Sequence, residues 1–285
     1  MERYINIDKH KLYIKTMGKG EPILFIHGGP GLCHNYFLPY LEELSDKSTL
    51  IFYDQRGNGK SFFEIGNDDE ISLETFIDDI EFIRTSLDID RLNVFGHSMG
   101  GILAINYALK YGDNVNKLVL SNSIPLRFED FNQMNVIKRN KIHPMDFKEL
   151  IKLQNSKKFK DYNEELFMQY ISILEKSSFI NDHRAYEFTK NLNFQGKHYK
   201  NFLNINVRLI NEYMYNIRFK DINIEKIKCP TLIIFGTNDF IPHSSLEYLS
   251  SNIKKSDVKY IDNAAHYPFI EEKEKMISIL KDFFQ

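Results

Sequence analysis

A serine flanked by glycines, between a strand-like run and a helix-like run, is the feature that most constrains the fold of this chain. The stretch 96–100 reads Gly-His-Ser-Met-Gly and places Ser98 at its centre. The apolar residues 92–95 predict a buried strand before it, and the apolar residues 102–105 predict a helix after it. A strand that turns directly into a helix needs small residues where the two backbones cross, and it carries the central serine at the tip of the turn. The sequence therefore predicts a serine held out at the edge of a sheet.

The length and composition fit one α/β domain, or a core domain with a large insertion. The chain has 285 residues, of which 42% are hydrophobic, and its formal net charge is -2 at pH 7. This charge balance gives no basic surface of the kind that nucleic-acid-binding domains carry. Cys33 and Cys229 are too far apart in the sequence for a metal-binding or redox motif. We find neither a secretion signal nor an apolar stretch of membrane-spanning length, and therefore expect a cytoplasmic protein with no membrane or nucleic-acid partner.

The first half of the chain alternates strand-like and helix-like segments, which is typical of a mostly parallel sheet. The predicted strands of this half cover residues 4–7, 12–17, 23–26, 49–53, 92–95 and 117–120, the first two as a hairpin. Apolar residues between positions 73 and 87 recur with the period of an amphipathic helix. The same organisation returns late in the chain, with predicted strands at 231–235 and 258–261 and a closing helix at 272–284.

The segment between these two parts, residues 125–224, shows no clear strand-turn-helix units and is rich in Phe, Tyr, Lys and Asn. This pattern predicts several short helices. We therefore predict an α/β core formed by residues 1–124 and 225–285, with residues 125–224 inserted as a helical cap over the sheet. An aromatic cap would exclude water and restrict access to small substrates, so we expect the choice of substrate to depend on it.

A serine at a strained turn becomes a nucleophile when a base and an orienting acid lie beside it. In a sheet of this kind the three residues follow one another in the order serine, acid, histidine, in loops after strands. Asp239 follows the predicted strand at 231–235, and His266 follows the one at 258–261. We therefore predict Ser98, Asp239 and His266 as the nucleophile, the orienting acid and the general base.

Two other residues compete for these roles. His243 lies only four residues after Asp239, in the same loop, which is a poor position for the base. Asp262 lies in the loop of His266 itself, where an aspartate more often caps a turn. Both alternatives are weaker than the predicted triad.

The negatively charged oxygen that forms during acyl transfer needs two preorganised backbone N–H groups. Met99, the residue after the predicted nucleophile, supplies one of them at the start of a helix. The stretch 27–31 reads His-Gly-Gly-Pro-Gly after a predicted strand, and its glycines let the backbone approach a substrate closely. We predict that Gly29 supplies the second N–H group.

The stretch 54–61 reads Asp-Gln-Arg-Gly-Asn-Gly-Lys-Ser and ends like a phosphate-binding loop. It lacks the first glycine of the Gly-x-x-x-x-Gly-Lys-Ser pattern, because that position is Asp54. We therefore predict a turn that the Asp and Arg side chains hold close to the site, and no nucleotide cofactor.

Together, the motifs at 27–31, 54–61 and 96–101 resemble those of the proline iminopeptidases, also called prolyl aminopeptidases, and of the related tricorn-interacting aminopeptidase. The resemblance covers both segments of the predicted core. It implies the α/β-hydrolase fold, with a mostly parallel central sheet and an inserted helical cap. It also implies a serine peptidase that releases an N-terminal residue, often proline, from short peptides without a metal or an organic cofactor. The resemblance does not fix the oligomeric state, for which a monomer is the simplest expectation.

The resemblance further implies carboxylates that bind the cationic amine of the substrate, because a buried ammonium group must be compensated. The stretch 211–213 reads Asn-Glu-Tyr and resembles an Asn-Glu-aromatic element of the family, which makes Glu212 the first candidate. In the tricorn-type branch a second carboxylate directly follows the catalytic acid, but this chain has Phe240 there. In another branch a cap glutamate follows a tryptophan. Glu187 follows Tyr186 and is the nearest equivalent, and an exposed helix position explains it equally well.

Two other functions stay open at the level of sequence. A small-molecule esterase or lactonase would use the same triad with an uncharged cap pocket. A ligand receptor of the same fold would bind in that pocket without efficient turnover, because a fold does not dictate a function. Dehalogenase and epoxide hydrolase chemistry fits poorly, since both use a carboxylate where this chain has Ser98. The expected partner is accordingly a short peptide or a small acyl compound.

Overall fold

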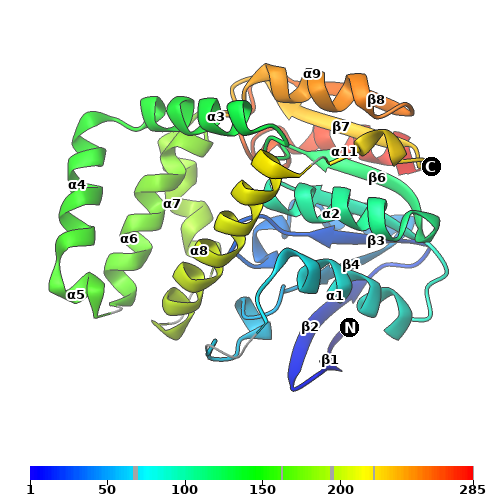
Figure 1. Cartoon of the computed structure of the whole chain (residues 1–285), viewed down its shortest axis with the longest axis horizontal. Helices are drawn as coiled ribbons and strands as arrows, with labels where there is room; N and C mark the ends of the chain where they lie inside the picture. Colours follow the sequence, from blue (N-terminus) through cyan, green and yellow to red (C-terminus); the bar gives the residue numbers. More distant parts are fainter. Residues whose placement is uncertain (67–69, 162, 193–195, 221, 285) are drawn as a thin grey trace.

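An eight-stranded sheet forms the centre of the molecule, in the order β1-β2-β4-β3-β5-β6-β7-β8 (Figure 1). The structure is a computed structural model, and it describes residues 1–66, 70–161, 163–192, 196–220 and 222–284. The strands are β1 Glu2–Ile7, β2 His10–Met17, β3 Glu21–Ile26, β4 Ser48–Tyr53, β5 Leu92–His97, β6 Val115–Ser121, β7 Thr231–Gly236 and β8 Ser256–Ile261. Each strand that the sequence predicts is present, with ends that differ by a few residues.

Strand pairing divides the sheet into an antiparallel edge and a parallel remainder. β1 pairs antiparallel with β2, and β2 with β4, which confirms the predicted opening hairpin. The other neighbouring strands are parallel. β5 lies inside the parallel part, and all of its residues are buried. Because parallel strands end at the same edge, the loops after β3, β5, β6, β7 and β8 meet there, and a site is expected at that edge.

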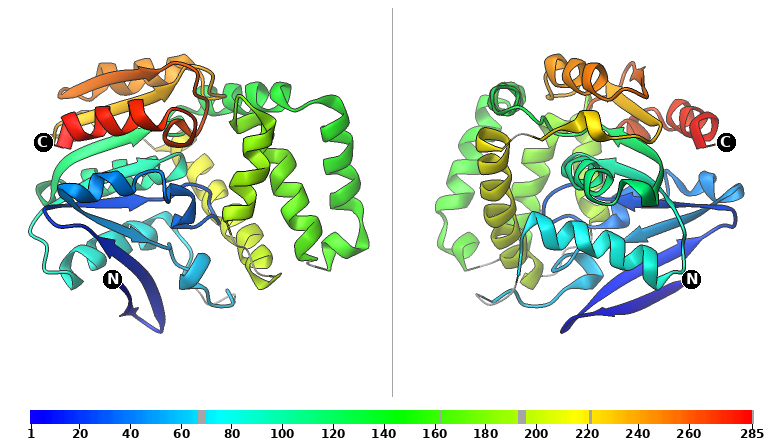
Figure 2. Two further views of the ribbon diagram at one scale, coloured as in Figure 1. Left: turned by 180° about the vertical axis from the view of Figure 1, so that it is seen from behind. Right: turned by 45° about the vertical axis from the view of Figure 1, so that its right-hand side comes forward.

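Helices cover both faces of the sheet (Figure 2). Among those that contribute to the apolar cluster on one face are α1 Leu73–Ser86, α2 Met99–Lys110 and α9 His243–Asn252. On the other face α11 Lys273–Phe284 follows the short α10 Pro268–Glu271 and buries Met276 and Leu280 in a second apolar cluster. The α/β organisation that the sequence predicts is therefore confirmed.

The start of α1 shows how local sequence sets these elements. Its N-cap residue is Ser72, whose hydroxyl accepts a hydrogen bond from the N–H of Thr75. The Thr75 hydroxyl in turn accepts one from the N–H of Ser72, so two donors that the helix cannot satisfy are paired. The apolar residues of α1 recur every three or four positions and face the sheet, as the periodicity predicts.

The helices between β6 and β7 stand beside the carboxyl end of the sheet, on the left of Figure 1. They are α3 Phe128–Lys141, α4 Pro144–Asn155, α5 Lys157–Lys160, α6 Glu164–Glu175, α7 Asp182–Asn191 and α8 Gly196–Phe219. α8 has 24 residues, so the expectation of short helices alone is wrong. Its length follows from a continuous apolar stripe whose buried members are Ile205, Leu209, Tyr213 and Ile217. In the described residues we find no helix that combines the length and the apolar character needed to cross a membrane.

Candidate active site

The turn between β5 and α2 holds Ser98 in a strained conformation. Its backbone has φ 55° and ψ -122°, values that are rare for a residue with a side chain. The neighbouring glycines are required by space. A Cβ on Gly100 would lie 2.2 Å from the carbonyl oxygen of Ile26, and one on Gly96 would lie 2.5 Å from the carbonyl oxygen of Gly100. The strand-turn-helix element that the sequence predicts is therefore present.

Ser98, His266 and Asp239 come from three loops and form one chain of hydrogen bonds. The Oγ of Ser98 lies 2.9 Å from Nε2 of His266, and Nδ1 of His266 lies 3.1 Å from both carboxylate oxygens of Asp239. Because a carboxylate only accepts, Nδ1 carries the proton, and in the neutral ring Nε2 accepts from the Ser98 hydroxyl. Ser98 is 8% exposed and His266 3%, and the side chain of Asp239 is fully enclosed. The structure thus brings the three residues together with the contacts that activation of a serine requires.

Asn122 is a fourth residue of this arrangement, and it is not among the residues predicted from the sequence. It follows β6, is fully buried and has φ 48°. Its Nδ2 donates to Oδ2 of Asp239 at 2.7 Å and to the carbonyl oxygen of Ala265 at 3.0 Å. The backbone N–H of Phe240 donates to the other oxygen of Asp239 at 2.6 Å. These donors fix the carboxylate in the orientation that it presents to the histidine. The available signal was the polar run 121–123 directly after an apolar strand.

The two residues that compete for the triad lie elsewhere. His243 begins α9 with an exposed side chain and contacts Glu247 and Tyr260. The side chain of Asp262 is 75% exposed and lies 3.7 Å from Lys275. Neither is hydrogen-bonded to the serine in the part of the chain that the structure describes. The structure therefore favours the three residues predicted from the sequence.

The glycine-rich loop after β3 passes close to the serine. A Cβ on Gly28 would lie 2.9 Å from the Cβ of Ser98, so a side chain at this position would displace the loop. The N–H of Gly28 donates to the hydroxyl of Tyr36. The N–H groups of Gly29 and Met99, by contrast, have no hydrogen-bond acceptor within the described residues. Unpaired donors in this loop and at the start of α2 are the groups that an oxyanion requires.

The turn after β4 is held by charged side chains, as predicted. Asp54 is buried and accepts hydrogen bonds from the ring and the N–H of His34 and from the N–H of Lys60. Burial would raise the pKa of Asp54, but the hydrogen bonds and charge of His34 outweigh it and lower the pKa below its usual range. Arg56 pairs with Asp79 of α1 through an Nε–Oδ2 contact of 2.8 Å. Because Asp54 occupies the N–H of Lys60 that a phosphate would need, this turn is not a phosphate-binding loop.

A buried histidine in the glycine-rich loop makes the stability of the protein depend on pH. His27 is fully buried, and desolvation lowers its pKa from the ordinary value of 6.5 to about 4. The unfolded chain therefore binds the proton at a higher pH than the folded protein does. The stability that the neutral ring contributes is present above pH 6.5, and it is lost as the pH falls toward 4.

We predict that lowering the pH from about 7 to about 4.5 reduces the free energy of unfolding by about 2 kcal/mol more in the wild-type protein than in His27→Asn. The asparagine removes the titrating ring, while its amide N–H replaces the ring Nδ1–H that donates to the carbonyl oxygen of Gly28 at 2.9 Å. Urea titrations at several pH values measure the difference, and His183→Asn, at a side chain that is 73% exposed, is the control. Parallel pH profiles of the wild type and His27→Asn would contradict the prediction.

Glu212, the first candidate for binding an amine, caps a helix. It lies half-buried on α8, where its Oε2 accepts a hydrogen bond of 2.8 Å from the N–H of Leu73, the first residue of α1. The same helix contacts the glycine-rich loop, since Nδ2 of Asn206 donates to the carbonyl oxygen of Pro30 at 2.6 Å. Glu212 therefore belongs to the helix that packs against this loop, and one of its carboxylate oxygens already has a partner.

Glu187, the second candidate, lies on the surface. Its side chain is 59% exposed on α7 and lies 3.7 Å from Nδ1 of His183, four residues earlier in the helix. An exposed position that pairs along its own helix is the ordinary environment of a surface glutamate. The structure does not bring Glu187 to Ser98, and the explanation as an exposed helix residue is the better one.

Phe240 replaces the carboxylate that the tricorn-type branch carries directly after the catalytic acid. It is buried, and its ring lies 4.4 Å from the ring of His266. The ammonium group of Lys138 lies 4.5 Å from the centre of the Phe240 ring. An aromatic wall and a cation thus occupy this position, so a substrate amine must find its counter-charge elsewhere.

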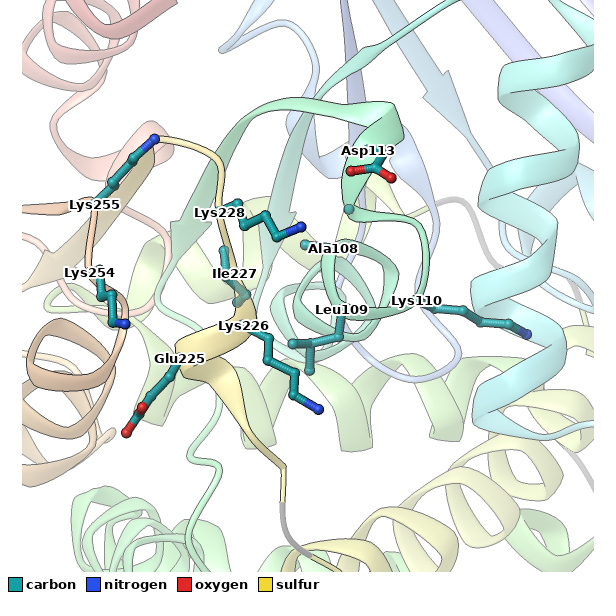
Figure 3. Close-up of a pocket in the computed structure, with 11 residues that line it drawn as sticks. Ala108, Leu109, Lys110, Asp113, Glu225, Lys226, Ile227, Lys228, Lys254 and Lys255 are labelled. Carbon is teal, nitrogen blue, oxygen red and sulfur yellow. The ribbon is translucent and has the colours of Figure 1, made fainter.

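A lysine-rich pocket lies at the end of α2 that is remote from the serine (Figure 3). The pocket has a volume of about 670 Å³. Lys110, which lines it, is the last residue of α2, whereas Ser98 lies directly before the first residue of this helix. A helix of 12 residues is about 18 Å long, so this pocket is far from the triad. Its lysines, among them Lys254 and Lys255, point in different directions in Figure 3 and converge on no common point. Within the described residues, no cluster of three His, Cys, Asp or Glu side chains is arranged to hold a metal ion.

Comparison with known proteins agrees with this fold. Residues 21–150 match the family model of the alpha/beta hydrolase fold. The chain is 30% identical over 276 residues to a proline iminopeptidase of Heyndrickxia coagulans, a match that covers 93% of this chain and 91% of that protein. A solved proline iminopeptidase of Mycobacterium smegmatis has a TM-score of 0.68 and 17% identity, with 99% of this chain and 97% of that chain covered. A solved esterase of Exiguobacterium antarcticum has a TM-score of 0.70 and 21% identity, with 99% of both chains covered.

The two solved structures share the fold, and at this level of identity they say nothing more. The similarity to the Heyndrickxia coagulans protein is closer and extends over nearly the whole chain. It confirms both the α/β-hydrolase fold and the family resemblance carried by the three sequence motifs. The chain therefore belongs to the proline iminopeptidase family of α/β-hydrolases.

Proposed function

We propose that this hydrolase works through an acyl-enzyme, with Ser98 as nucleophile, His266 as general base and Asp239 as orienting acid. The observation that carries the proposal is the 2.9 Å contact between Oγ of Ser98 and Nε2 of His266, made by a serine on a strained turn. The N–H groups of Gly29 and Met99 are the proposed oxyanion donors.

The proposed reaction has two steps. Oγ of Ser98 attacks the carbonyl carbon of the substrate while its proton passes to Nε2 of His266, and the negative charge moves to the carbonyl oxygen. The bond to the leaving group then breaks, and the leaving group takes the proton from His266. In the second step a water molecule gives a proton to the same nitrogen and attacks the acyl carbon. The acid is released, and the proton returns to Ser98. Asp239 stabilises the imidazolium in both steps.

Within this class we propose an aminopeptidase that releases the N-terminal residue, proline or another small apolar residue, from short peptides. The similarity over nearly the whole chain to a proline iminopeptidase supports this choice. Glu212 is the proposed partner of the substrate amine. Its Oε2 binds the N–H of Leu73, and its Oε1 has no hydrogen-bond partner within the described residues. A carboxylate that faces a desolvated ammonium group replaces part of the lost hydration with a charge-assisted hydrogen bond.

Glu212→Gln separates amine binding from helix capping. The glutamine keeps a carbonyl oxygen for the N–H of Leu73 but removes the negative charge, so α1 stays capped while the amine loses its partner. We predict that kcat/KM for prolyl p-nitroanilide falls about 100-fold, whereas kcat/KM for p-nitrophenyl butyrate changes by less than about threefold. Steady-state kinetics on the two substrates measures both values.

The matched control for this prediction is Glu247→Gln, the same change at a glutamate of α9 whose side chain is 68% exposed. Both activities of this control should stay at the wild-type level. Equal losses on the anilide and on the ester in Glu212→Gln would mean that the residue acts on the shape of the site and not on the amine, and the assignment would then be wrong.

A small-molecule esterase is the second candidate, and the surroundings of Phe240 favour it. The aromatic ring against His266 offers an apolar wall to an uncharged acyl group, and the cationic Lys138 beside it disfavours a substrate ammonium group. A panel of aminoacyl p-nitroanilides and p-nitrophenyl acyl esters, run on the wild type and on Ser98→Ala, decides between the two candidates. Hydrolysis of the esters alone would mean that the protein is an esterase and not an aminopeptidase.

A further inference from the structure

Three hydrogen bonds connect the glycine-rich loop to the loop of His266 through the side chains of Tyr36 and His97. The hydroxyl of Tyr36, in the short 3-10 helix His34–Phe37, accepts from the N–H of Gly28 and lies 3.0 Å from Nδ1 of His97. Nε2 of His97 lies 2.8 Å from the backbone carbonyl oxygen of His266. His97 is the last residue of β5 and directly precedes the nucleophile in the sequence.

Chemistry fixes the donor and the acceptor of each bond. A carbonyl oxygen only accepts, so Nε2 of His97 carries a proton. In the neutral ring Nδ1 is then an acceptor, and the hydroxyl of Tyr36 must donate to it. Desolvation keeps this ring neutral, because it holds the pKa of His97 well below its ordinary value. The three bonds therefore point in one direction, from Gly28 to His266.

Packing leaves the two side chains few alternative positions. Tyr36 is 1% exposed, and His97 is fully buried. The ring of His97 is surrounded by the rings of Tyr267 at 5.0 Å, Phe269 at 5.2 Å and Phe37 at 6.3 Å. Side chains in such a densely packed region keep their rotamers, and water does not compete for their hydrogen bonds.

We propose that Tyr36 and His97 are positioning residues, which hold the oxyanion loop and the general base in fixed places relative to Ser98. The inference rests on the proposed function and adds two residues to its machinery. Tyr36 takes the N–H of Gly28 and thereby leaves the next N–H of the loop, that of Gly29, for the oxyanion.

His97 acts at the other end of the chain of bonds, on the main chain of His266. Its Nε2–H holds the carbonyl oxygen of His266, while the N–H of His266 donates to the carbonyl oxygen of Ser178 at 3.0 Å. Ser178 ends the 3-10 helix Lys176–Ser178, which lies between α6 and α7 in the chain. The main chain of the proposed base is therefore held from the sheet on one side and from the helices of residues 125–224 on the other.

The test compares Tyr36→Phe and His97→Gln with the control Tyr53→Phe. Tyr36→Phe removes only the hydroxyl. His97→Gln keeps an amide N–H for the carbonyl oxygen of His266 but lacks the acceptor at the place of Nδ1. Tyr53 is fully buried, and its hydroxyl has no hydrogen-bond partner in the part of the chain that the structure describes, so its phenylalanine variant makes the same chemical change without losing a bond.

Two readouts are measured for each variant: kcat and KM on a substrate that the wild type hydrolyses, and the rate of labelling by a fluorophosphonate. We expect Tyr36→Phe and His97→Gln each to lower kcat and the labelling rate about 10-fold to 100-fold with KM nearly unchanged, because small displacements of reacting groups have effects of this size. Tyr53→Phe should behave like the wild type.

The double variant of Tyr36 and His97 tests whether the two residues act as one unit. If they do, combining the substitutions lowers kcat little further than the more damaging single one does. An unchanged kcat in Tyr36→Phe, a loss confined to KM, or losses that simply multiply in the double variant would overturn the inference. If Tyr36→Phe does not fold, as judged by circular dichroism, the test rests on His97→Gln. The same loss of kcat is expected of that variant, and an unchanged kcat or a loss confined to KM would overturn the inference.

The labelling experiment separates failure of this inference from failure of the proposed function. A fluorophosphonate forms a P–O bond with an activated serine and releases fluoride, whatever the natural substrate is. If the wild type does not react, or if Ser98→Ala reacts equally fast, the proposed function fails and this inference fails with it. If the wild type reacts through Ser98 and Tyr36→Phe reacts at the same rate, only the positioning role is wrong.

Discussion

Ser98→Ala is expected to lower kcat/KM on every substrate of this protein by at least about 10⁴-fold. The substitution removes the oxygen that lies 2.9 Å from Nε2 of His266, so no acyl-enzyme forms and only water remains as a nucleophile. Steady-state hydrolysis of the best substrate in the panel measures the loss. The thermal unfolding temperature shows whether the variant is folded, and it should change little, because alanine fits wherever serine does.

The residual activity of Ser98→Ala shows whether Ser98 is the nucleophile. Binding of the substrate and the oxyanion donors are untouched, so a small residual rate above that of the uncatalysed reaction is expected. If a folded Ser98→Ala protein retains more than about 1% of the wild-type kcat/KM, the nucleophile is a residue other than Ser98.

Asp239→Asn is expected to lower kcat about 10⁴-fold with a small change in KM. Both oxygens of Asp239 face Nδ1 of His266 at 3.1 Å and already accept from Asn122 and from the N–H of Phe240. An amide group in this place directs an N–H at Nδ1, which shifts the ring proton to Nε2. The ring can then no longer accept the proton of Ser98.

Asp262→Asn is the matched control for this variant, since it makes the same change at the aspartate that competed for the role in the sequence. The side chain of Asp262 is 75% exposed and lies near Lys275. Its kcat should equal that of the wild type. Similar losses in the two variants, or a larger loss in Asp262→Asn, would show that Asp239 is not the orienting acid.

The parts of the molecule that local patterns determine were predictable from the sequence. The glycines around Ser98 are required by space, because a Cβ on Gly100 would lie 2.2 Å from the carbonyl oxygen of Ile26. This requirement explains the five-residue pattern Gly-His-Ser-Met-Gly that is visible in the sequence. The positions of Asp239 and His266 follow from the order of the strands, because loops after parallel strands share one edge of the sheet.

Features that depend on contacts between distant segments were not predictable in this way. Asn122 reaches Asp239 across 117 residues of sequence, and its neighbours 121–123 form only a short polar run. Tyr36 and His97 are 61 residues apart and look like ordinary aromatic and turn residues until the fold joins them. The sequence left two explanations for Glu187, and the exposed position of its side chain on α7 favours the surface.

The role of Ser98 as the nucleophile is tested by identifying the residue that a fluorophosphonate modifies. The wild-type protein is labelled, digested and analysed by mass spectrometry, and its residual hydrolysis is measured on the same sample. We predict a single adduct, on the peptide that contains Ser98, and a loss of hydrolysis in proportion to the labelled fraction. An adduct on another residue, or full hydrolysis by protein that is labelled at Ser98, would contradict it.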